Sequence, residues 1–377
     1  MKIAEIRTHL LRHRLDQPFQ SAFSTFTDRW ACLVEILCDD GTVGWGECLG
    51  PAGPNAATVK AMAPLILGHD PLRIEPIWTL VYNQFRDQGQ RGLALTAQSG
   101  IDIALWDIAG KHFGQPVHVL AGGAYRDSVP AYATGGFRQR GRDRIAALEE
   151  EMARHVADGF TAAKIKIGYG HAIDLLAIRA ARDVLGLERR LMVDANHGYD
   201  AIEAIRLGRA AAEHDIDWFE EPVVPEQLAA YRDVRAGQPI PVAGGETWQG
   251  RAAHAEAIAA RAVDILQPDV AACGGITEMR KIASMAETAG IRLVPHVWGT
   301  GITVAASLQM LAILPPVPQR HAPSDPWLEF DRTDNPFRMA ILKQPITCSE
   351  GRVAIPQGPG LGIEIDRAAL AEWSVPG

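Results

Sequence analysis

The chain has 377 residues, of which 47% are hydrophobic and 22% are charged, and its formal net charge is −8. A chain of this length buries a large core and is expected to form more than one domain. The negative charge excludes a nucleic-acid partner, because phosphate binding needs a basic patch.

Cysteine usage and the apolar runs set the expected compartment. The five cysteines are odd in number and lack C-x-x-C spacing, which favours a reduced, cytoplasmic location. The opening segment MKIAEIRTHLLRHRL carries scattered charges instead of an apolar core, and no later apolar run is long enough to cross a bilayer. We therefore expect neither a signal peptide nor a membrane partner.

The N-terminal part of the chain predicts strands followed by helices. Residues 30–48, WACLVEILCDDGTVGWGEC, contain two alternating runs around an Asp-Asp-Gly turn, which indicates a β-hairpin or meander. Residues from about 56 to 120 show helical spacing, as in ATVKAMAPLIL and LTAQSGIDIALWDIAGKHF. Strands followed by helices are typical of an α+β domain.

From about Ala131 to about His321, strand-like runs alternate with alanine-rich helical segments such as RIAALEEEMARHVADG and AIEAIRLGRAAAEHD. This alternation fits a parallel barrel, in which the carboxyl ends of all strands point to one face. The tail from about residue 331 is rich in Gly and Pro.

Three carboxylates recur at intervals of 26 residues in the alternating part: Asp194, Glu220 and Glu246. Each closes a short apolar run, and a βα unit of a barrel has roughly 25–35 residues, so the three acids should converge. Such a set of hard oxygen ligands suits one Mg²⁺ per subunit, with Mn²⁺ as an alternative ion. The competing interpretation is that each acid caps the helix after its own strand.

The neighbouring strands carry basic groups in the same phase. Residues 162–168, AAKIKIG, alternate, so Lys164 and Lys166 should project onto one face, where the carboxylates would neutralise them. The runs VDILQPD and IRLVPH end at Asp269 and His296. An Asp one strand before a His can accept its Nδ1–H and leave Nε2 as a proton acceptor.

These groups define two candidate bases. Lys166 is the first, because the like charge of Lys164 should lower its pKa from about 10.4. His296, oriented by Asp269, is the second, on the opposite side of the pocket. A base on each side permits racemisation, dehydration of a sugar acid or opening of a lactone, and the residues alone do not choose among them.

Taken together, these motifs make the chain similar to the enolase superfamily, and within it to the mandelate racemase subgroup. The resemblance rests on Lys164-Ile165-Lys166, Asp194-Ala195-Asn196, Glu220-Glu221-Pro222, Gly245-Glu246-Thr247, Asp269, His296 and Trp327-Leu328-Glu329. It implies an α/β fold: a modified TIM barrel, (β/α)7β, with an N-terminal α+β capping domain that the C-terminal tail completes. The expected divisions are 1–125, 126–330 and 331–377.

The resemblance also implies roles for individual residues. Asp194, Glu220 and Glu246 would bind the metal, and Lys164, Lys166, Asp269 and His296 would be catalytic. Glu329 would donate a hydrogen bond to the substrate carboxylate. Asn196, Glu221 and Trp298 would support the metal ligands or contact substrate, although Glu221 could equally pair with a basic barrel residue and Trp298 could pack between helices. Two loops, 19–29 and 50–55, would form the lid.

Several stretches, among them DDGTVGWGECLGP, RDQGQRG, WFEEPVVPEQL and EFDRTDNPFR, resemble the lactone-opening cycloisomerases of that superfamily. This implies Mg²⁺-dependent removal of a proton α to a carboxylate, with β-elimination that opens D-galactaro-1,4-lactone to a linear keto-deoxy-hexarate. The alternatives are an acid-sugar dehydratase acting on an open-chain aldarate or aldonate, a racemase or epimerase, and a non-catalytic metal-binding relative. The expected partners are an acid sugar or its lactone and further copies of the chain.

Overall fold

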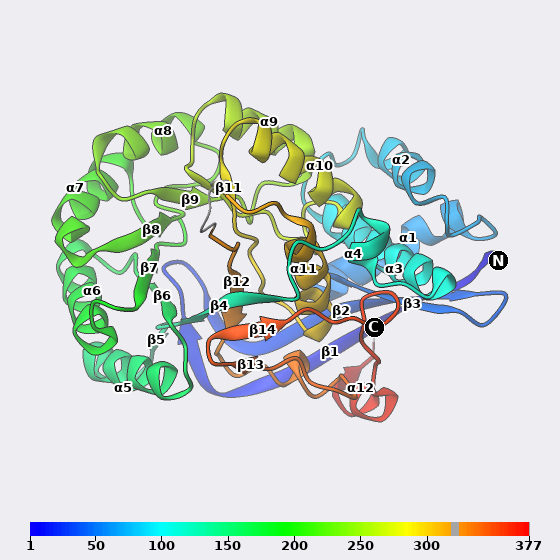
Figure 1. The fold of residues 1–377 in the computed structure, drawn as a ribbon, viewed down its shortest axis with the longest axis horizontal. Coiled ribbons are helices and arrows are strands. Elements are labelled where there is room, and N and C mark those ends of the chain that lie inside the picture. Colours follow the sequence, from blue (N-terminus) through cyan, green and yellow to red (C-terminus); the bar gives the residue numbers. More distant parts are fainter. Residues whose placement is uncertain (318–323, 377) are drawn as a thin grey trace.

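The computed structural model describes residues 1–317 and 324–376. An N-terminal sheet with its helices lies beside a barrel, and the two are in broad contact (Figure 1). The predicted end of the strand–helix alternation, near His321, lies outside the described residues. No helix in the described ranges is long and apolar enough to span a bilayer.

The N-terminal unit is an antiparallel sheet in the order β15-β1-β2-β3, covered by helices. Its strands are β1 (Ile3–Gln20), β2 (Thr25–Cys38), β3 (Val43–Cys48) and, from the far end of the chain, β15 (Ser374–Val375). Its helices are α1 (Ala52–Ile66), α2 (Ile74–Phe85), α3 (Leu93–Phe113) and α4 (Val117–Leu120). Pairing of β2 with β3 across the Asp-Asp-Gly turn confirms the predicted hairpin.

Helix α3 packs against β3 almost backbone to backbone. A Cβ added at Gly46 would lie 1.9 Å from the carbonyl oxygen of Gly100, and one at Gly44 would lie 2.2 Å from that of Ala104. Only glycine permits this approach, since any side chain would force the helix away from the sheet.

Among the described residues, the barrel has eight parallel strands in the order β12-β4-β6-β7-β8-β9-β10-β11, with helices α5 to α11 in the connections. The strands are β4 (Ser128–Gly135), β6 (Ala162–Lys166), β7 (Arg190–Asp194), β8 (Ile216–Glu220), β9 (Val242–Gly244), β10 (Ile265–Leu266), β11 (Arg292–Leu293) and β12 (Leu328–Asp331). The helices are α5 (Arg144–Ala157), α6 (His171–Leu185), α7 (Ala201–Ala211), α8 (Leu228–Gly237), α9 (Gly250–Ala259), α10 (Gly275–Thr288) and α11 (Gly301–Ile313). The predicted (β/α)7β architecture is confirmed.

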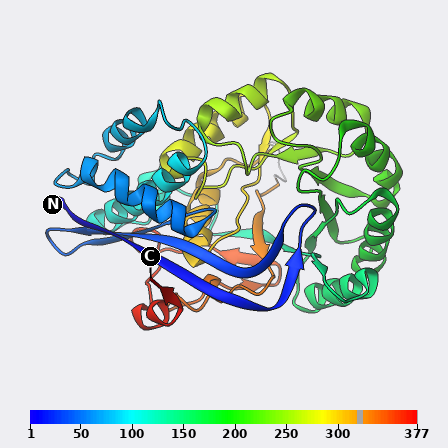
Figure 2. The ribbon, with the colours of Figure 1, turned by 180° about the vertical axis from the view of Figure 1, so that it is seen from behind.

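The C-terminal tail contacts both units. Its strands β13 (Cys348–Ser349) and β14 (Arg352–Ala354) form a hairpin that extends the barrel sheet by pairing with β4. Helix α12 (Arg367–Trp373) and β15 then lie along β1, as the red and blue ribbons of Figure 2 show. The expected return to the N-terminal sheet thus involves the last residues of the tail. The exact divisions at 125/126 and 330/331 stay predictions.

A buried carboxylate joins the two units. Glu47 at the end of β3 accepts hydrogen bonds from the backbone N–H groups of Thr300 (2.9 Å) and Thr303 (3.1 Å), at the N-terminus of α11. The hydroxyl groups of the same two threonines donate to it at 2.7 and 2.6 Å. A buried carboxylate with four donors holds its surroundings in place, because separation would leave the charge unsolvated.

A second buried acid at this junction gives a testable pH dependence. Asp102 on α3 accepts the backbone N–H of Thr277 on α10 at 2.9 Å. Burial raises the pKa of Asp102 to about 7, with Glu75 and Glu278 adding to the increase and the Thr277 bonds opposing it. Because the folded pKa exceeds the unfolded value of about 3.9, this group's contribution to stability is complete below pH 4 and is lost as pH rises through 7.

We therefore expect the stability of Asp102→Asn relative to the unsubstituted chain to increase by about 2.6 kcal/mol from pH 5 to pH 8. Urea unfolding at both pH values measures the difference. Asp233→Asn, at an exposed position, serves as the control. An identical pH dependence for Asp102→Asn and the unsubstituted chain would contradict this account.

Candidate active site

The three in-phase carboxylates come together at the carboxyl ends of neighbouring strands. Asp194 and Glu220 are the last residues of β7 and β8, and Glu246 lies two residues beyond β9. One carboxylate oxygen from each lies within 4.8 Å of the others. Asp194 and Glu220 are buried, whereas the Glu246 side chain is 18% exposed. The geometry is that of a site open on one side to a cation and its other ligands.

Both predicted lysines project into the same site from β6. Lys164 Nζ bonds Glu220 and lies 2.8 Å from Glu329 Oε1, and Lys166 Nζ bonds Asp194. Both side chains are buried, so the carboxylates supply the neutralisation that buried ammonium groups require.

The expectation that Lys164 lowers the pKa of Lys166 is wrong as a net result. Burial and the charge of Lys164 do lower it, but Asp194, Glu246 and Glu220 raise the pKa above its ordinary value. The prediction considered only the neighbouring lysine on the same strand. The acids at or just beyond the ends of the next strands raise the pKa by more than burial and Lys164 lower it.

The carboxylates themselves show how crowded the site is. Burial alone would raise the pKa of Asp194, but the charges of Lys166 and Lys164 have the larger effect and lower the pKa to about 2. Burial raises the pKa of Glu220 to about 7, where repulsion from Asp194 and other acids adds to the increase and Lys164 opposes it. A further cation among these acids would relieve that repulsion, so the residues present fit a divalent metal ion.

The predicted Asp–His pair is present. His296 Nδ1 lies 2.7 Å from Asp269 Oδ2, and its Nε2 lies 3.5 Å from Glu246 Oε2. Burial lowers the pKa of His296, but Glu246, Asp269 and Glu329 raise it to about 10. With this pKa the imidazole ring is protonated at neutral pH and can donate a proton. It can act as a base only after Nε2 has lost its proton.

Glu329 on β12 faces the lysines. It accepts hydrogen bonds from Thr134 Oγ1 at 2.7 Å and from the backbone N–H of Val297 at 3.0 Å. Burial raises its pKa, but Lys164 and His296 lower it to about 2. It is therefore an ionised acceptor here. The predicted donor role requires its protonated form and stays a prediction.

Two residues expected near the metal ligands occupy strained positions. Asn196 and Glu221 have φ of 41° and 44°, a region that favours glycine, and such strain clusters at functional sites. The backbone N–H of Asn196 donates to Asp194 Oδ1 at 2.8 Å, which orients that carboxylate. Glu221 lies 3.2 Å from Nε2 of His197. Its basic neighbour is thus a residue that the sequence analysis did not single out.

Trp298 lies beside Lys166 in a cluster of aromatic rings, and its contact with substrate stays a prediction. Its ring lies 5.3 Å from that of Phe137, and both rings flank Lys166, whose Nζ is 5.9 Å from Trp298 and 5.1 Å from Phe137. Phe19 and Phe26, from β1 and β2, complete the cluster. An aromatic wall from both units therefore stands beside the first candidate base.

The tip of the β1–β2 hairpin, within the expected lid 19–29, reaches the barrel loops. Tyr169 Oη donates to the carbonyl of Gln20 at 2.6 Å. A Cβ added at Gly168 would lie 2.8 Å from that of Ala22, so this glycine leaves room for the tip. The other expected lid loop, 50–55, is mostly the first turn of α1. The lid function of both segments stays a prediction.

Comparison with known families identifies the fold. Residues 147–369 match the enolase C-terminal domain-like family, and residues 4–122 match the mandelate racemase / muconate lactonizing enzyme N-terminal domain. The chain belongs to the enolase superfamily. The N-terminal match agrees with the predicted mandelate racemase subgroup.

The relatives are similar over the whole chain. D-galactarolactone cycloisomerase of Agrobacterium fabrum is 60% identical over 376 residues, which cover 100% of both chains. The crystal structure of 3,6-anhydro-D-galactonate cycloisomerase from Zobellia galactanivorans is 37% identical, covers 100% of both chains and has a TM-score of 0.91. A structure of L-talarate/galactarate dehydratase liganded with Mg and L-glucarate is 28% identical, covers 100% of this chain and 92% of the other, and has a TM-score of 0.88.

Some residues of the site were missed. Trp218 Nε1 and Gln267 Nε2 donate to Glu220 Oε2 at 2.9 and 2.6 Å. Each lies two residues before an acid that was predicted, Glu220 or Asp269, so the period of two in a strand could have found them. Thr134 comes from β4, which carries no acidic or basic residue that would draw attention to it.

Proposed function

We propose that the chain catalyses the Mg²⁺-dependent opening of D-galactaro-1,4-lactone to a linear keto-deoxy-hexarate. The observation that carries the proposal is the placement of a candidate base at each end of the acidic group. Lys166 bonds Asp194 at one end, and His296 lies 3.5 Å from Glu246 at the other. The 60% identity to D-galactarolactone cycloisomerase supports the choice of substrate.

Asp194, Glu220 and Glu246 would hold one Mg²⁺ per subunit, or Mn²⁺ in its place. When bound, the ion would supply positive charge beside the substrate carboxylate. Lys164 adds a second positive charge there, fixed in position by Glu220 and Glu329. These positive charges would favour the negative charge that develops when a base removes the proton from the carbon next to the carboxylate.

Lys166 and His296 would divide the proton transfers. One of them takes the α-proton, and the ring carboxylate then leaves from the β-carbon. The resulting enol ketonises to the linear product without net loss of water. Asp269 holds His296 Nδ1 at 2.7 Å, so Nε2 is the atom that exchanges protons with substrate.

The second candidate is dehydration of an open-chain acid sugar. Expulsion of hydroxide needs a general acid, and His296, with its pKa raised to about 10, is a protonated group in position to act as one. The relative with L-glucarate bound is a dehydratase by name. A racemase or epimerase would use the same two bases. Both lysines and the Asp–His pair are kept, which argues against a non-catalytic relative.

We also propose a cytoplasmic homo-oligomer. All five cysteines are free thiols, four of them buried, which suits a reducing compartment. Large apolar side chains are exposed at Phe113 and Tyr125, 57% and 64% respectively, and would be covered in an assembly.

The choice between the two reactions rests on the leaving group. A carboxylate, whose conjugate acid has a pKa near 4, leaves far more readily than hydroxide. We expect fresh D-galactaro-1,4-lactone to turn over at least about a hundredfold faster than galactarate, a difference of at least about 2.7 kcal/mol in the barrier. Formation of the α-keto acid is followed with Mg²⁺ and short assay times, and Lys166→Ala corrects for spontaneous lactone hydrolysis. Equal or faster use of galactarate would favour the dehydratase.

A further inference from the structure

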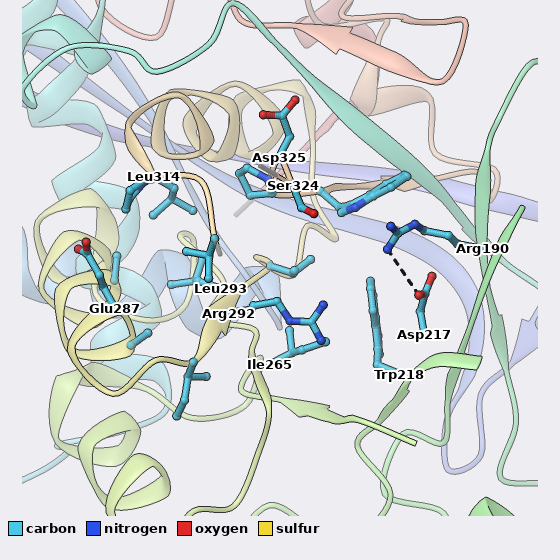
Figure 3. Close-up of a pocket in the computed structure, with 18 residues that line it drawn as sticks. Arg190, Asp217, Trp218, Ile265, Glu287, Arg292, Leu293, Leu314, Ser324 and Asp325 are labelled. Atoms are coloured by element: carbon cyan, nitrogen blue, oxygen red, sulfur yellow. Dashed lines mark hydrogen bonds and ion pairs between the residues drawn. The ribbon is translucent and has the colours of Figure 1, made fainter. Parts of the chain in front are cut away.

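A cavity of about 240 Å³ lies at the end of the barrel opposite the carboxylates. Part of its lining comes from the beginnings of barrel strands (Figure 3): Arg190 opens β7, Ile265 opens β10, Arg292 opens β11, and Trp327 directly precedes β12. The rest comes mainly from α10 and from residues 314–317 and 324–326. None of the residues assigned to the reaction lines this cavity.

The cavity lining contains two arginines and three acids, and one of these arginines has no ion pair among the described residues. Arg190 and Arg292 point their guanidinium groups toward the same space (Figure 3). The nearest carboxylate, Asp217, lies 3.4 Å from Arg190 Nη1. Arg292 has no ion pair among the described residues. Of the remaining acids, Asp325 is 3.1 Å from both Arg126 and Arg352, and Glu287 lies at the far edge of the group.

The rest of the lining is aromatic and aliphatic. It includes Trp218, Trp327, Leu293, Val294 and Leu314. The ring of Trp218 is 3% exposed and is held in place, since its Nε1 is hydrogen-bonded inside the barrel. These walls suit a planar apolar body, and a guanidinium fork suits a carboxylate.

We propose that this cavity binds a small carboxylate with a planar apolar body, and that the bound ligand affects the metal site through Trp218. The indole ring of Trp218 lines the cavity, while its Nε1 donates to Glu220 Oε2 at 2.9 Å. A ligand that moves the ring therefore changes the hydrogen bonding of a carboxylate assigned to the metal. The coupling rests on the proposed metal role of Glu220, whereas the binding itself does not.

Binding is tested by titration calorimetry of the full chain with phenylacetate in the presence of a chelator, so that no metal attracts the probe to the other site. We expect one saturable site, and at least tenfold weaker binding for Arg292→Leu. The matched control, Arg206→Leu, removes an exposed arginine on α7 and should bind like the unsubstituted chain. Phenylacetamide, which lacks the charge, should bind at least tenfold more weakly than phenylacetate.

Absence of saturable binding would overturn the proposal, as would equal affinity for the amide or an equal loss in both arginine variants. Because Arg292 is exposed, its replacement should leave the fold intact, and circular dichroism checks this.

Coupling is tested by measuring Mg²⁺ affinity with and without saturating phenylacetate. Linkage requires each ligand to change the affinity of the other by the same factor, and we expect at least about fivefold. Trp218→Phe keeps an aromatic wall but lacks the N–H donor, so it should bind phenylacetate while the factor falls toward one. Mg²⁺ binding that phenylacetate leaves unchanged would reject the coupling. Failure of Mg²⁺ to bind at all would instead reject the metal role and leave the cavity's binding result intact.

Discussion

Replacing Glu246 with Gln is expected to lower turnover by about a thousandfold, or about 4 kcal/mol in the barrier, while the chain stays folded. Glu246 lies within 4.8 Å of the other two carboxylates, and its side chain is 18% exposed. An amide there removes one charged ligand without burying a new group. Steady-state kinetics with Mg²⁺ measure the loss, and Glu226→Gln, the same change at an exposed position, should retain full activity.

Glu246 is a cleaner test than Glu220. Glu220 accepts hydrogen bonds from Lys164, Trp218 and Gln267. The NH₂ group of a glutamine at this position would face N–H donors that it cannot bond, which would destabilise the fold.

The same site predicts a ligand effect on stability. Mg²⁺ at a hundred times its Kd should stabilise the folded chain by about 2.7 kcal/mol and raise Tm. In Glu246→Gln most of this increase should be lost. Full activity after thorough removal of metal would contradict the assignment of all three carboxylates.

Removing either candidate base should lower turnover by about 10²- to 10⁴-fold, the usual contribution of a positioned acid or base. Lys166 and His296 contact opposite ends of the acidic group, so each variant should keep the base on the other side. Incorporation of deuterium from D₂O into recovered D-galactaro-1,4-lactone reports which base reaches the α-proton. The variant that keeps the base facing this proton should exchange it although net turnover stops.

Lys166→Ala and His296→Asn are compared with Lys60→Ala and His112→Asn, which make the same changes at exposed positions. Unchanged turnover in both site variants would rule out the proposed roles. A loss in only one of them would restrict the chemistry to a single base.

The convergence of the site residues could be predicted because it depends on the repeat and not on where each strand ends. The spacing of 26 residues placed Asp194, Glu220 and Glu246 at equivalent points of successive βα units. Strand membership was less predictable, since β9 has three residues and β10 and β11 have two each. Asp269 and His296 accordingly lie on loops beyond their strands.

Long-range pairing and net electrostatics were not accessible from the sequence. Pairing of β14 with β4 joins segments more than 200 residues apart, and no local pattern in the Gly- and Pro-rich tail specifies it. The pKa of Lys166 depends on acids that only the folded barrel brings near. Trp218 does not titrate, so the sequence pattern alone does not distinguish it from an ordinary core residue.

The four hydrogen bonds at Glu47 also bear on how substrate enters and product leaves. Tilting the whole N-terminal unit would break these bonds and leave the Glu47 carboxylate without its donors. Moving residues 21–24 at the hairpin tip needs only local changes in a short turn. In the predicted lid role, passage would therefore need motion of the hairpin tip alone, on the microsecond-to-millisecond timescale of active-site lids, and no tilt of the N-terminal unit.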